Sequence, residues 1–168
     1  MTTWDLRSRV AADHEQHVAD ELRRRGYRVE PWGLGTFRPV CKAMIQACDS
    51  PLRYLPDLIA APRNQPHRAV LIDCKAQLRD AADERAIEQD CADAGLALAA
   101  AARLPIWYVF SDLAVSSPQD VLATGRLTPP GPNGSGSFYY RVPRALDRDF
   151  DAVFGGLPAQ QLVLLPAA

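Results

Sequence analysis

Apolar residues recur every three or four positions over residues 4–25, which is the spacing of an amphipathic helix. Gly26 follows this stretch directly and is a usual signal for the end of a helix. Residues 27–32 then alternate between apolar and polar side chains, as a half-buried strand does. The pattern therefore predicts a long helix followed by a strand.

Two short apolar segments, 58–60 and 69–72, predict buried strands joined by a polar turn that contains prolines. The second segment runs directly into Asp73-Cys74-Lys75. Because residues i and i+2 of a strand face the same side, Asp73 and Lys75 should project together. If the two strands pair, Asp57, which precedes the first of them, reaches the same edge of the sheet.

Helical and extended patterns alternate over the rest of the chain. Alanine-rich residues predict a helix from about residue 80 or 82 to 103, and the apolar segment 105–110 predicts a buried strand after it. With the strand at 69–72, these elements imply a right-handed βαβ unit. The remaining expected elements are a helix at 117–124 capped by Ser117, a flexible loop at 125–137, a strand at 138–142 and a short helix at 144–154.

The segment 33–54 is longer than most connections within compact domains, and long loops of this kind are often functional. It holds a short extended stretch at 36–40 and a short helical one at 42–47. We interpret the segment as an insertion that contacts the substrate; the alternative is a purely structural excursion. The whole pattern predicts a single α/β domain over residues 1–168, with a central mixed β-sheet flanked by helices.

The composition is that of an ordinary soluble globular protein, with 48% hydrophobic and 23% charged residues among 168. No apolar run approaches the length of a membrane span, and the first residues lack the apolar core of a signal peptide. The four cysteines, at positions 41, 48, 74 and 91, show no CxxC spacing. We therefore expect a cytoplasmic protein with free thiols and no membrane partner.

The net charge of −1 argues against a generally basic surface for nucleic acid, but the charge is unevenly distributed. Residues 1–80 carry 13 basic and 10 acidic side chains, whereas residues 81–168 carry 6 basic and 10 acidic ones. The excess of positive charge in the first part is compatible with a local phosphate-binding face.

Two carboxylates and an ammonium at one sheet edge suit the metal-dependent hydrolysis of a phosphodiester. Asp57 and Asp73 supply oxygen ligands for a hard cation, and Lys75 can orient or help to deprotonate the attacking water. Of the 19 basic residues in the chain, only two are lysines. Because arginine cannot readily give up a proton or act as a compact point charge, a lysine at position 75 is informative. The alternative is a plain ion pair between Asp73 and Lys75 at the end of a strand.

These residues resemble the motif of the PD-(D/E)xK nuclease superfamily. Pro56-Asp57 corresponds to its PD, and Asp73-Cys74-Lys75 to its (D/E)xK, with aspartate where glutamate is commoner. Glu15 lies on the predicted first helix, at the place of a glutamate found in archaeal-type Holliday junction resolvases and their phage and mobile-element relatives. The resemblance spans residues 11–112 and implies a restriction-endonuclease-like fold.

The resemblance also implies a Mg²⁺-dependent endonuclease that hydrolyses DNA, with junction or branched DNA as a favoured substrate. Asp57 and Asp73 would bind the ion, with Glu15 completing its shell directly or through water. Lys75 would position the attacking water, and Mn²⁺ should substitute for Mg²⁺. The expected substrate contacts are Arg38, Lys42, Arg53 and Gln77, with Gln89 as a further candidate.

A homodimer is expected on this interpretation, because a resolvase must act on two symmetric strands of a junction. The apolar segment 161–165 is one candidate for the dimer interface. The residues do not separate DNA from RNA, nor junction cleavage from restriction-type, nicking or mobile-element cleavage.

Two other functions stay open. The first is a catalytically inactive module that keeps the nuclease fold and binds nucleic acid or a protein partner. It differs from the enzyme in whether the carboxylates converge on one point. The second is a zinc hydrolase built on His14 and His17, which would need a third ligand such as Cys41, Cys48 or His67.

Overall fold

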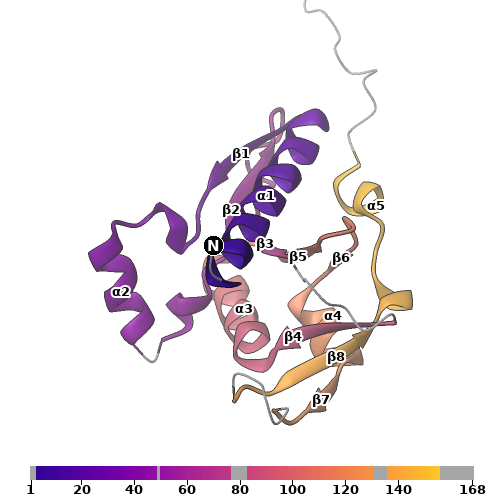
Figure 1. Cartoon of the computed structure of the whole chain (residues 1–168). Coiled ribbons are helices and arrows are strands. Elements are labelled where there is room, and N and C mark those ends of the chain that lie inside the picture. The colour runs from indigo at the N-terminus through magenta and orange to yellow at the C-terminus, as the bar shows by residue number, and fades with distance from the viewer. Residues whose placement is uncertain (1–2, 49, 77–82, 131–135, 156–168) are drawn as a thin grey trace, which may run out of the picture.

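The computed structural model describes residues 3–48, 50–76, 83–130 and 136–155, and a five-stranded sheet lies at its centre (Figure 1). Strands β3 and β5 run parallel, and the other neighbours in this sheet run antiparallel. The predicted central mixed sheet is therefore confirmed. In spatial order its strands are β1 (Tyr27–Pro31), β2 (Leu58–Pro62), β3 (Val70–Lys75), β5 (Ile106–Phe110) and β6 (Val115–Ser116).

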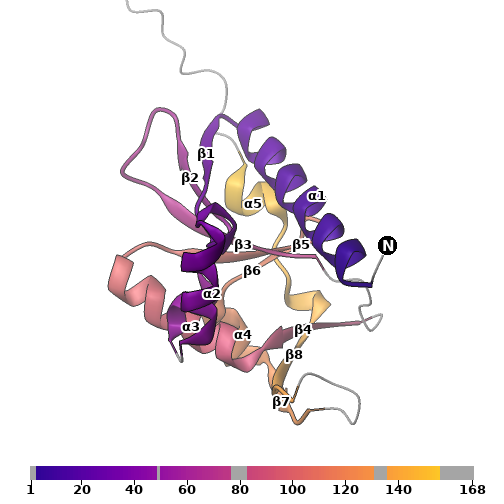
Figure 2. The same cartoon turned by 60° about the vertical axis from the view of Figure 1, so that its left-hand side comes forward.

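One face of this sheet is covered by α1 (Thr3–Arg24) and α5 (Phe150–Phe154), and Figure 2 shows α1 lying across it. Val18 and Leu22 of α1 are fully buried there, in one hydrophobic cluster with residues of β1, β2, β3 and β5. Their spacing of four positions is the stripe by which the sequence predicts this helix. Gly26, at φ +86°, follows the helix as expected.

The other face carries α3 (Gln89–Ala102), α4 (Pro118–Thr124) and a second, antiparallel sheet. This sheet has the strand order β4 (Glu84–Glu88), β8 (Tyr139–Pro143), β7 (Arg126–Thr128). Successive residues of β5 serve the two cores in turn: Val109 packs on the α1 side, and Tyr108 and Phe110 pack on the α3 side. Such a strand, buried on both faces, explains why residues 105–110 show an unbroken apolar run.

The predicted helix at 117–124 is confirmed together with its cap. The Asp120 N–H donates to the Ser117 hydroxyl at 3.1 Å, and the Ser117 N–H donates to the Asp120 carboxylate at 3.1 Å. This reciprocal pair satisfies two donors that the first turn of a helix leaves unpaired.

The helix predicted from about residue 80 or 82 is wrong over its first part, because residues 84–88 form strand β4. Burial alternates along β4, and Arg85 is one of its two buried side chains, with 1% of its surface exposed. The Arg85 guanidinium pairs with Asp112 at 2.7 Å and with Asp147 at 2.9 Å. An arginine counts as polar in a hydrophobic pattern, so the alternation of this strand was hidden.

The extended stretch predicted at 36–40 is also wrong. A 3₁₀ turn, η1 (Leu34–Thr36), and helix α2 (Pro39–Ala47) occupy this region. Pro39 is the first residue of α2, a position that suits proline because its missing N–H would have no helical partner there. The helix expected at 42–47 is confirmed and begins three residues earlier.

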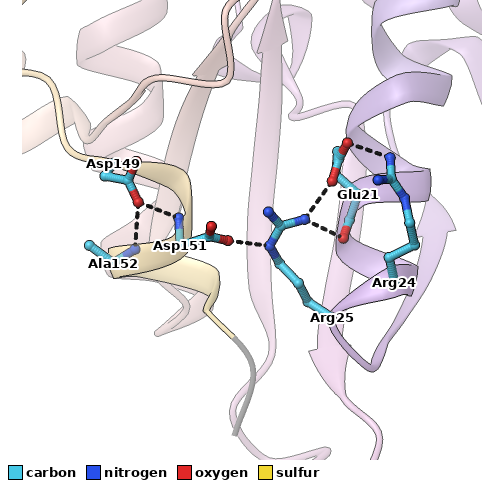
Figure 3. Close-up of polar contacts among 6 residues, drawn as sticks. All are labelled: Glu21, Arg24, Arg25, Asp149, Asp151 and Ala152. Carbon is cyan, nitrogen blue, oxygen red and sulfur yellow. Dashed lines mark hydrogen bonds and ion pairs between the residues drawn. The ribbon is translucent and has the colours of Figure 1, made fainter. Parts of the chain in front are cut away.

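Two elements late in the chain differ from the prediction as well. The loop expected at 125–137 contains strand β7, and its residues 131–135 lie outside the described part. Strand β7 forms because it pairs with β8, about 13 residues further along the chain, and a local pattern does not indicate such a partner. The helix expected at 144–154 is divided into η3 (Arg144–Leu146) and α5. Asp149 causes the division, because its carboxylate accepts from the N–H groups of Asp151 and Ala152 and starts a new helix (Figure 3).

Arg25 joins the ends of α1 and α5 (Figure 3). Its guanidinium donates to Asp151 at 2.6 Å and to the Glu21 carboxylate at 2.5 Å, and it lies 4.7 Å from the centre of the Phe150 ring. Glu21 also accepts from Arg24. Arg25 therefore ties the end of α1 to α5, while Arg24 pairs within α1.

An arm projects from the body between β1 and β2 (Figure 1). It consists of η1, α2 and η2 (Pro51–Tyr54), and α2 has no buried residue. Its base is held where the Tyr54 hydroxyl donates to Asp90 of α3 at 3.4 Å. In the described ranges, no helix is both long enough and apolar enough to cross a membrane.

Candidate active site

Strand β3 presents Asp73 and Lys75 on the face of the sheet that α3 covers. In the register of β3 with β5, they lie opposite Tyr108 and Phe110, which belong to the core on the same side. The Lys75 ammonium contacts the Asp73 carboxylate at 2.7 Å, and the two side chains keep only 22% and 13% of their surface exposed. The expected projection of both residues to one side is therefore confirmed.

Cys91 of α3 completes this pair. The Lys75 ammonium donates to the Cys91 sulfur at 3.2 Å, and the Cys91 thiol lies 3.5 Å from the Asp73 carboxylate. Burial disfavours the charged form of Lys75, but the neighbouring Asp73 and Cys91 outweigh it and raise the pKa of Lys75 above its ordinary value. Lys75 is therefore a fixed cation at neutral pH in this arrangement.

Asp57 lies where the β2–β3 ladder ends. The last pair of that ladder is Leu58 with Ile72, and the Asp57 carboxylate accepts the N–H of Cys74 beyond it, at 2.7 Å. The Asp57 carbonyl in turn accepts the N–H of Trp32 at 2.7 Å and that of Gly33 at 3.1 Å. Asp57 is thus held from both sides by backbone groups.

Gly33 permits this contact. A Cβ atom at this position would meet the Pro56 carbonyl oxygen at 2.9 Å, the Asp57 Cα at 3.0 Å and the Asp57 carboxylate at 3.3 Å. A side chain here would therefore push the turn away from Asp57.

The acidic residues lie within electrostatic reach of one another. Burial, Asp73 and Glu15 together raise the pKa of Asp57 to about 8. Burial and Asp73 raise the pKa of Glu15, while Lys42 opposes the rise. The carboxyl groups of Asp57, Asp73 and Glu15 therefore lie close enough together to disfavour one another's ionised forms, with the Lys75 ammonium paired to Asp73 among them.

This donor set fits a hard divalent cation in its chemistry. Carboxylate oxygens are the ligands that Mg²⁺ prefers, and a cation would relieve the repulsion that raises the pKa of Asp57. Among the residues that the structure describes, no three His, Cys, Asp or Glu side chains are grouped closely enough to hold one ion. An ion here would therefore take one or two protein carboxylates and complete its shell with water, which is the usual habit of Mg²⁺.

The fold matches that of a known nuclease. The structure is similar to that of Hjc, a Holliday junction resolvase from the archaeal hyperthermophile Archaeoglobus fulgidus, with a TM-score of 0.55 and 12% sequence identity. The similarity covers 88% of this chain and 97% of the resolvase. The chain has a resolvase-like nuclease fold. No protein-family model matches the sequence, and no curated protein matches it either.

The four expected substrate contacts are placed differently around this resolvase-like core. Lys42 of α2 is close enough to lower the pKa of Glu15, so it lies at the border of the site. Arg38 and Arg53 are exposed on the arm, and Arg53 stacks 5.9 Å from the ring centre of its neighbour Tyr54. Gln77 lies outside the described residues. Gln89 is the first residue of α3 and uses its N–H on the Phe138 carbonyl at 2.9 Å.

The histidines do not form a zinc site in the described part of the chain. His14 is buried, and its ring nitrogen Nε2 lies 3.0 Å from the Val109 carbonyl oxygen. Burial lowers the pKa of His14, which suits a neutral packing residue. His17 is exposed on α1, and His67 lies on the β2–β3 turn at the other end of the sheet.

Three residues that shape the site were not predicted from the sequence: Cys91, Tyr108 and Gly33. The Tyr108 ring lies 5.1 Å below the Lys75 ammonium, and the Tyr108 hydroxyl donates to the Cys91 carbonyl at 3.2 Å. Both contacts join positions far apart in the chain, so no local pattern indicates them. Gly33 carried a weak signal, since it directly follows the strand at 27–32 and begins the proposed insertion.

Proposed function

We propose that this protein is a metal-dependent endonuclease that hydrolyses DNA phosphodiester bonds, with junction or branched DNA as its favoured substrate. The observation that carries the proposal is the convergence of Asp57, Asp73 and Lys75 at one edge of the sheet of a resolvase-like fold. The motif rests on residue spacing, and the fold similarity rests on backbone geometry. Their agreement supports a nuclease more strongly than either does alone.

In this proposal Asp57 and Asp73 hold Mg²⁺, with Glu15 joining through water. The bound ion would supply charge neutralisation at the phosphate and a lowered pKa of an adjacent water. Mn²⁺ should substitute, because it accepts the same oxygen ligands.

Lys75 positions the water that attacks the phosphorus in line with the leaving oxygen. Asp73 and Cys91 keep its ammonium in place, at 2.7 Å and 3.2 Å. Asp57 is fixed by its bond to the Cys74 N–H, so its carboxylate keeps a constant place relative to β3 as the negative charge of the phosphate changes. Preorganised groups of this kind need little rearrangement during the reaction.

The arm supports a preference for branched DNA. It projects between β1 and β2 and bears Arg38, Lys42 and Arg53, of which Lys42 is close enough to Glu15 to lower the pKa of that carboxyl. Cations on such a projection could contact a second DNA arm, which a plain duplex lacks. We further propose that the protein acts as a homodimer, so that two such sites meet two symmetric strands; the expected interface segment, 161–165, lies outside the described residues.

A cleavage assay on the purified chain with Mg²⁺ or Mn²⁺ tests the proposal. The substrates are linear duplex, supercoiled plasmid, single strand, flap and four-way junction, together with a matched RNA. We expect the wild type to cleave branched DNA fastest, and Lys75→Ala to lose cleavage by about a thousandfold while it still binds DNA. Asp73→Asn should also lose cleavage, whereas the matched control Asp13→Asn, an exposed acid of α1, should keep it.

The outcomes separate the candidates. Equal turnover by wild type and Lys75→Ala would refute the role given to this lysine. Retained DNA binding without cleavage of any substrate would support the inactive nuclease-fold module instead. Light scattering of the same samples, with and without junction DNA, tests the dimer.

A further inference from the structure

A pocket of about 750 Å³ lies at the end of the sheet opposite Asp57 and Lys75. The pairing register places Tyr27, Pro62 and Val70 at this end and Pro31, Leu58 and Lys75 at the other. Residues 70 and 75 of β3 are about 17 Å apart along an extended strand. The pocket is therefore a separate site, and the proposed nuclease chemistry makes no use of it.

Cationic side chains surround this pocket. Arg63 and Arg68 come from the β2–β3 turn, and Arg103 comes from the turn after α3. No Asp or Glu lines it within the described ranges. Arg25 also lines it but is already paired with Glu21 and Asp151, as Figure 3 shows. Arg63 and Arg103 have no side-chain partner among the described residues, so their charges face the pocket uncompensated.

Backbone hydrogen bonds fix where these arginines are attached. The Arg63 N–H donates to the Gly26 carbonyl at 3.0 Å, and the Arg68 N–H donates to the Gln65 carbonyl at 3.0 Å. The Leu71 N–H donates to the Pro105 carbonyl at 2.9 Å, which ties the turn bearing Arg103 to β3. The backbone of the turns that carry these arginines is therefore already ordered. An anion that binds the guanidinium groups would need to order their side chains but little of the backbone.

Arg103 occupies a backbone conformation that favours glycine. It is the residue that ends α3, at φ 55° and ψ 34°. Helices commonly end with glycine in this left-handed conformation, and another residue there costs about 1 kcal/mol. The positive charge of Arg103 suits the negative end of the helix dipole, which offsets part of this cost, and the same residue lines the pocket.

The wall of the pocket is aromatic. Tyr27 and Trp107 are half-buried, and each packs edge-on against Phe154, with ring centres 6.1 Å and 6.4 Å apart. Burial raises the pKa of the Tyr27 hydroxyl, although nearby Arg68 opposes this, so the ring stays neutral at physiological pH. The Arg148 guanidinium lies over the Trp107 ring, 5.2 Å from its centre, and the Arg68 guanidinium donates to the Gln65 side chain at 3.1 Å. Aromatic rings beside guanidinium groups are the combination that proteins use to stack a nucleobase and bind its phosphate.

We propose that this pocket binds a nucleotide, with the base on Tyr27 and Trp107 and the phosphate on Arg63, Arg68 and Arg103. The nucleotide comes either free from solution or as the end of a single strand. The binding does not involve Asp57, Asp73 or Lys75, so it can be tested separately from the proposed cleavage.

Binding to the full-length chain can be measured in EDTA, where metal-dependent cleavage is absent. Fluorescence anisotropy follows a short fluorescein-labelled oligodeoxythymidylate, and dTMP, thymidine and inorganic phosphate serve as competitors. We expect dTMP to compete better than thymidine or phosphate alone, because it supplies both base and phosphate. Direct calorimetric titration with dTMP then distinguishes the two sources: saturable binding indicates a free nucleotide, and binding of the oligonucleotide alone indicates a strand end.

Two variants identify the site. Arg63→Gln and Arg103→Gly should each weaken binding by about tenfold, the usual loss for one charge-assisted hydrogen bond. Arg103→Gly is informative because glycine suits the left-handed conformation, so the fold should be kept or stabilised while binding weakens. The control Arg126→Gln removes a charge from β7, a strand of the second sheet that does not line the pocket, and should bind like the wild type.

Three results would overturn the inference: wild-type affinity in both pocket variants, competition by phosphate equal to that by dTMP, or no binding of either probe. Lys75→Ala should bind both probes like the wild type. Loss of cleavage in Lys75→Ala with normal probe binding would show that the pocket binds nucleotide independently of the nuclease site.

Discussion

The Lys75 ammonium donates to the sulfur of Cys91 at 3.2 Å. Cys91 lies on α3, 16 residues after Lys75 in the chain. Burial and Asp73 raise the pKa of Cys91 to about 11, with Lys75 opposing, so the thiol is neutral at pH 7 and can accept this bond. Cys91 therefore acts as a positioning residue for the candidate catalytic lysine.

Replacement of Cys91 should lower turnover without abolishing it. In Cys91→Ala the ammonium keeps Asp73 but loses its second partner, so we expect kcat to fall by about three- to tenfold at nearly constant KM. Cys91→Ser, which restores an acceptor, should recover most of the rate. The exposed Cys48→Ala is the control, and steady-state cleavage of the best substrate is the measurement. A matching fall in thermal stability with unchanged kcat would assign Cys91 to packing alone.

The sequence predicted the parts of the site that depend on local spacing. Asp73 and Lys75 lie two residues apart on a strand, and their common direction follows from the period of the strand alone. Asp57 required one further assumption, that β2 pairs with β3, and the antiparallel register supports it. The first helix and β5 were predicted because their burial is continuous or strictly periodic.

The sequence could not predict contacts that depend on tertiary partners. Cys91 meets Lys75 only after α3 folds back across β3 and β5, and β7 becomes a strand only beside β8. Arg85 is the clearest case, because a buried charge is stable only where carboxylates meet it, and those belong to Asp112 and Asp147. Hydrophobic periodicity contains no information about such partners.

Gly33→Ala should damage the candidate site more than the fold. The new Cβ would meet backbone atoms of Pro56 and Asp57 at 2.9 Å and 3.0 Å, so the turn or Asp57 must move by a few tenths of an ångström. We expect cleavage to fall by about tenfold or more, with a loss of about 1 kcal/mol in the free energy of unfolding. Gly35→Ala is the matched control, because its Cβ would meet nothing within 4 Å. Equal activity in the two variants would contradict the placement of Asp57 in the site.

Arg85→Met should destabilise the protein strongly. The substitution removes the partner of the buried Asp147 carboxylate and the cation that lies 4.4 Å from the Phe110 ring centre. We expect the free energy of unfolding in urea to fall by about 3–5 kcal/mol, as is usual when one half of a buried ion pair is lost. The exposed Arg126→Met should change it by less than about 0.5 kcal/mol. A small loss in Arg85→Met would mean that the second sheet is held mainly by its apolar contacts.

The raised pKa of Asp57 predicts that the metal-free protein loses stability as the pH rises. Burial, Asp73 and Glu15 raise this pKa from 3.8 to about 8. Between these values the folded chain holds a proton that the unfolded chain has released, so the free energy of unfolding falls with increasing pH. We expect a loss of up to about 3–4 kcal/mol between pH 5 and pH 8, and a flatter profile in Asp57→Asn, measured by urea unfolding in EDTA.

The same proton should be expelled when Mg²⁺ binds. At pH 7 Asp57 is mostly protonated in the metal-free protein, and a carboxyl group must be deprotonated to bind a metal ion. Calorimetric titration with Mg²⁺ in two buffers of different ionisation enthalpy should therefore detect release of about one proton by the wild type. Asp57→Asn should bind more weakly and release none. Asp13→Asn, which changes an exposed acid of α1, should release the same proton as the wild type. Proton release that persists in Asp57→Asn would show that another group carries the titration, with Glu15 the first to test, because burial and Asp73 raise its pKa as well.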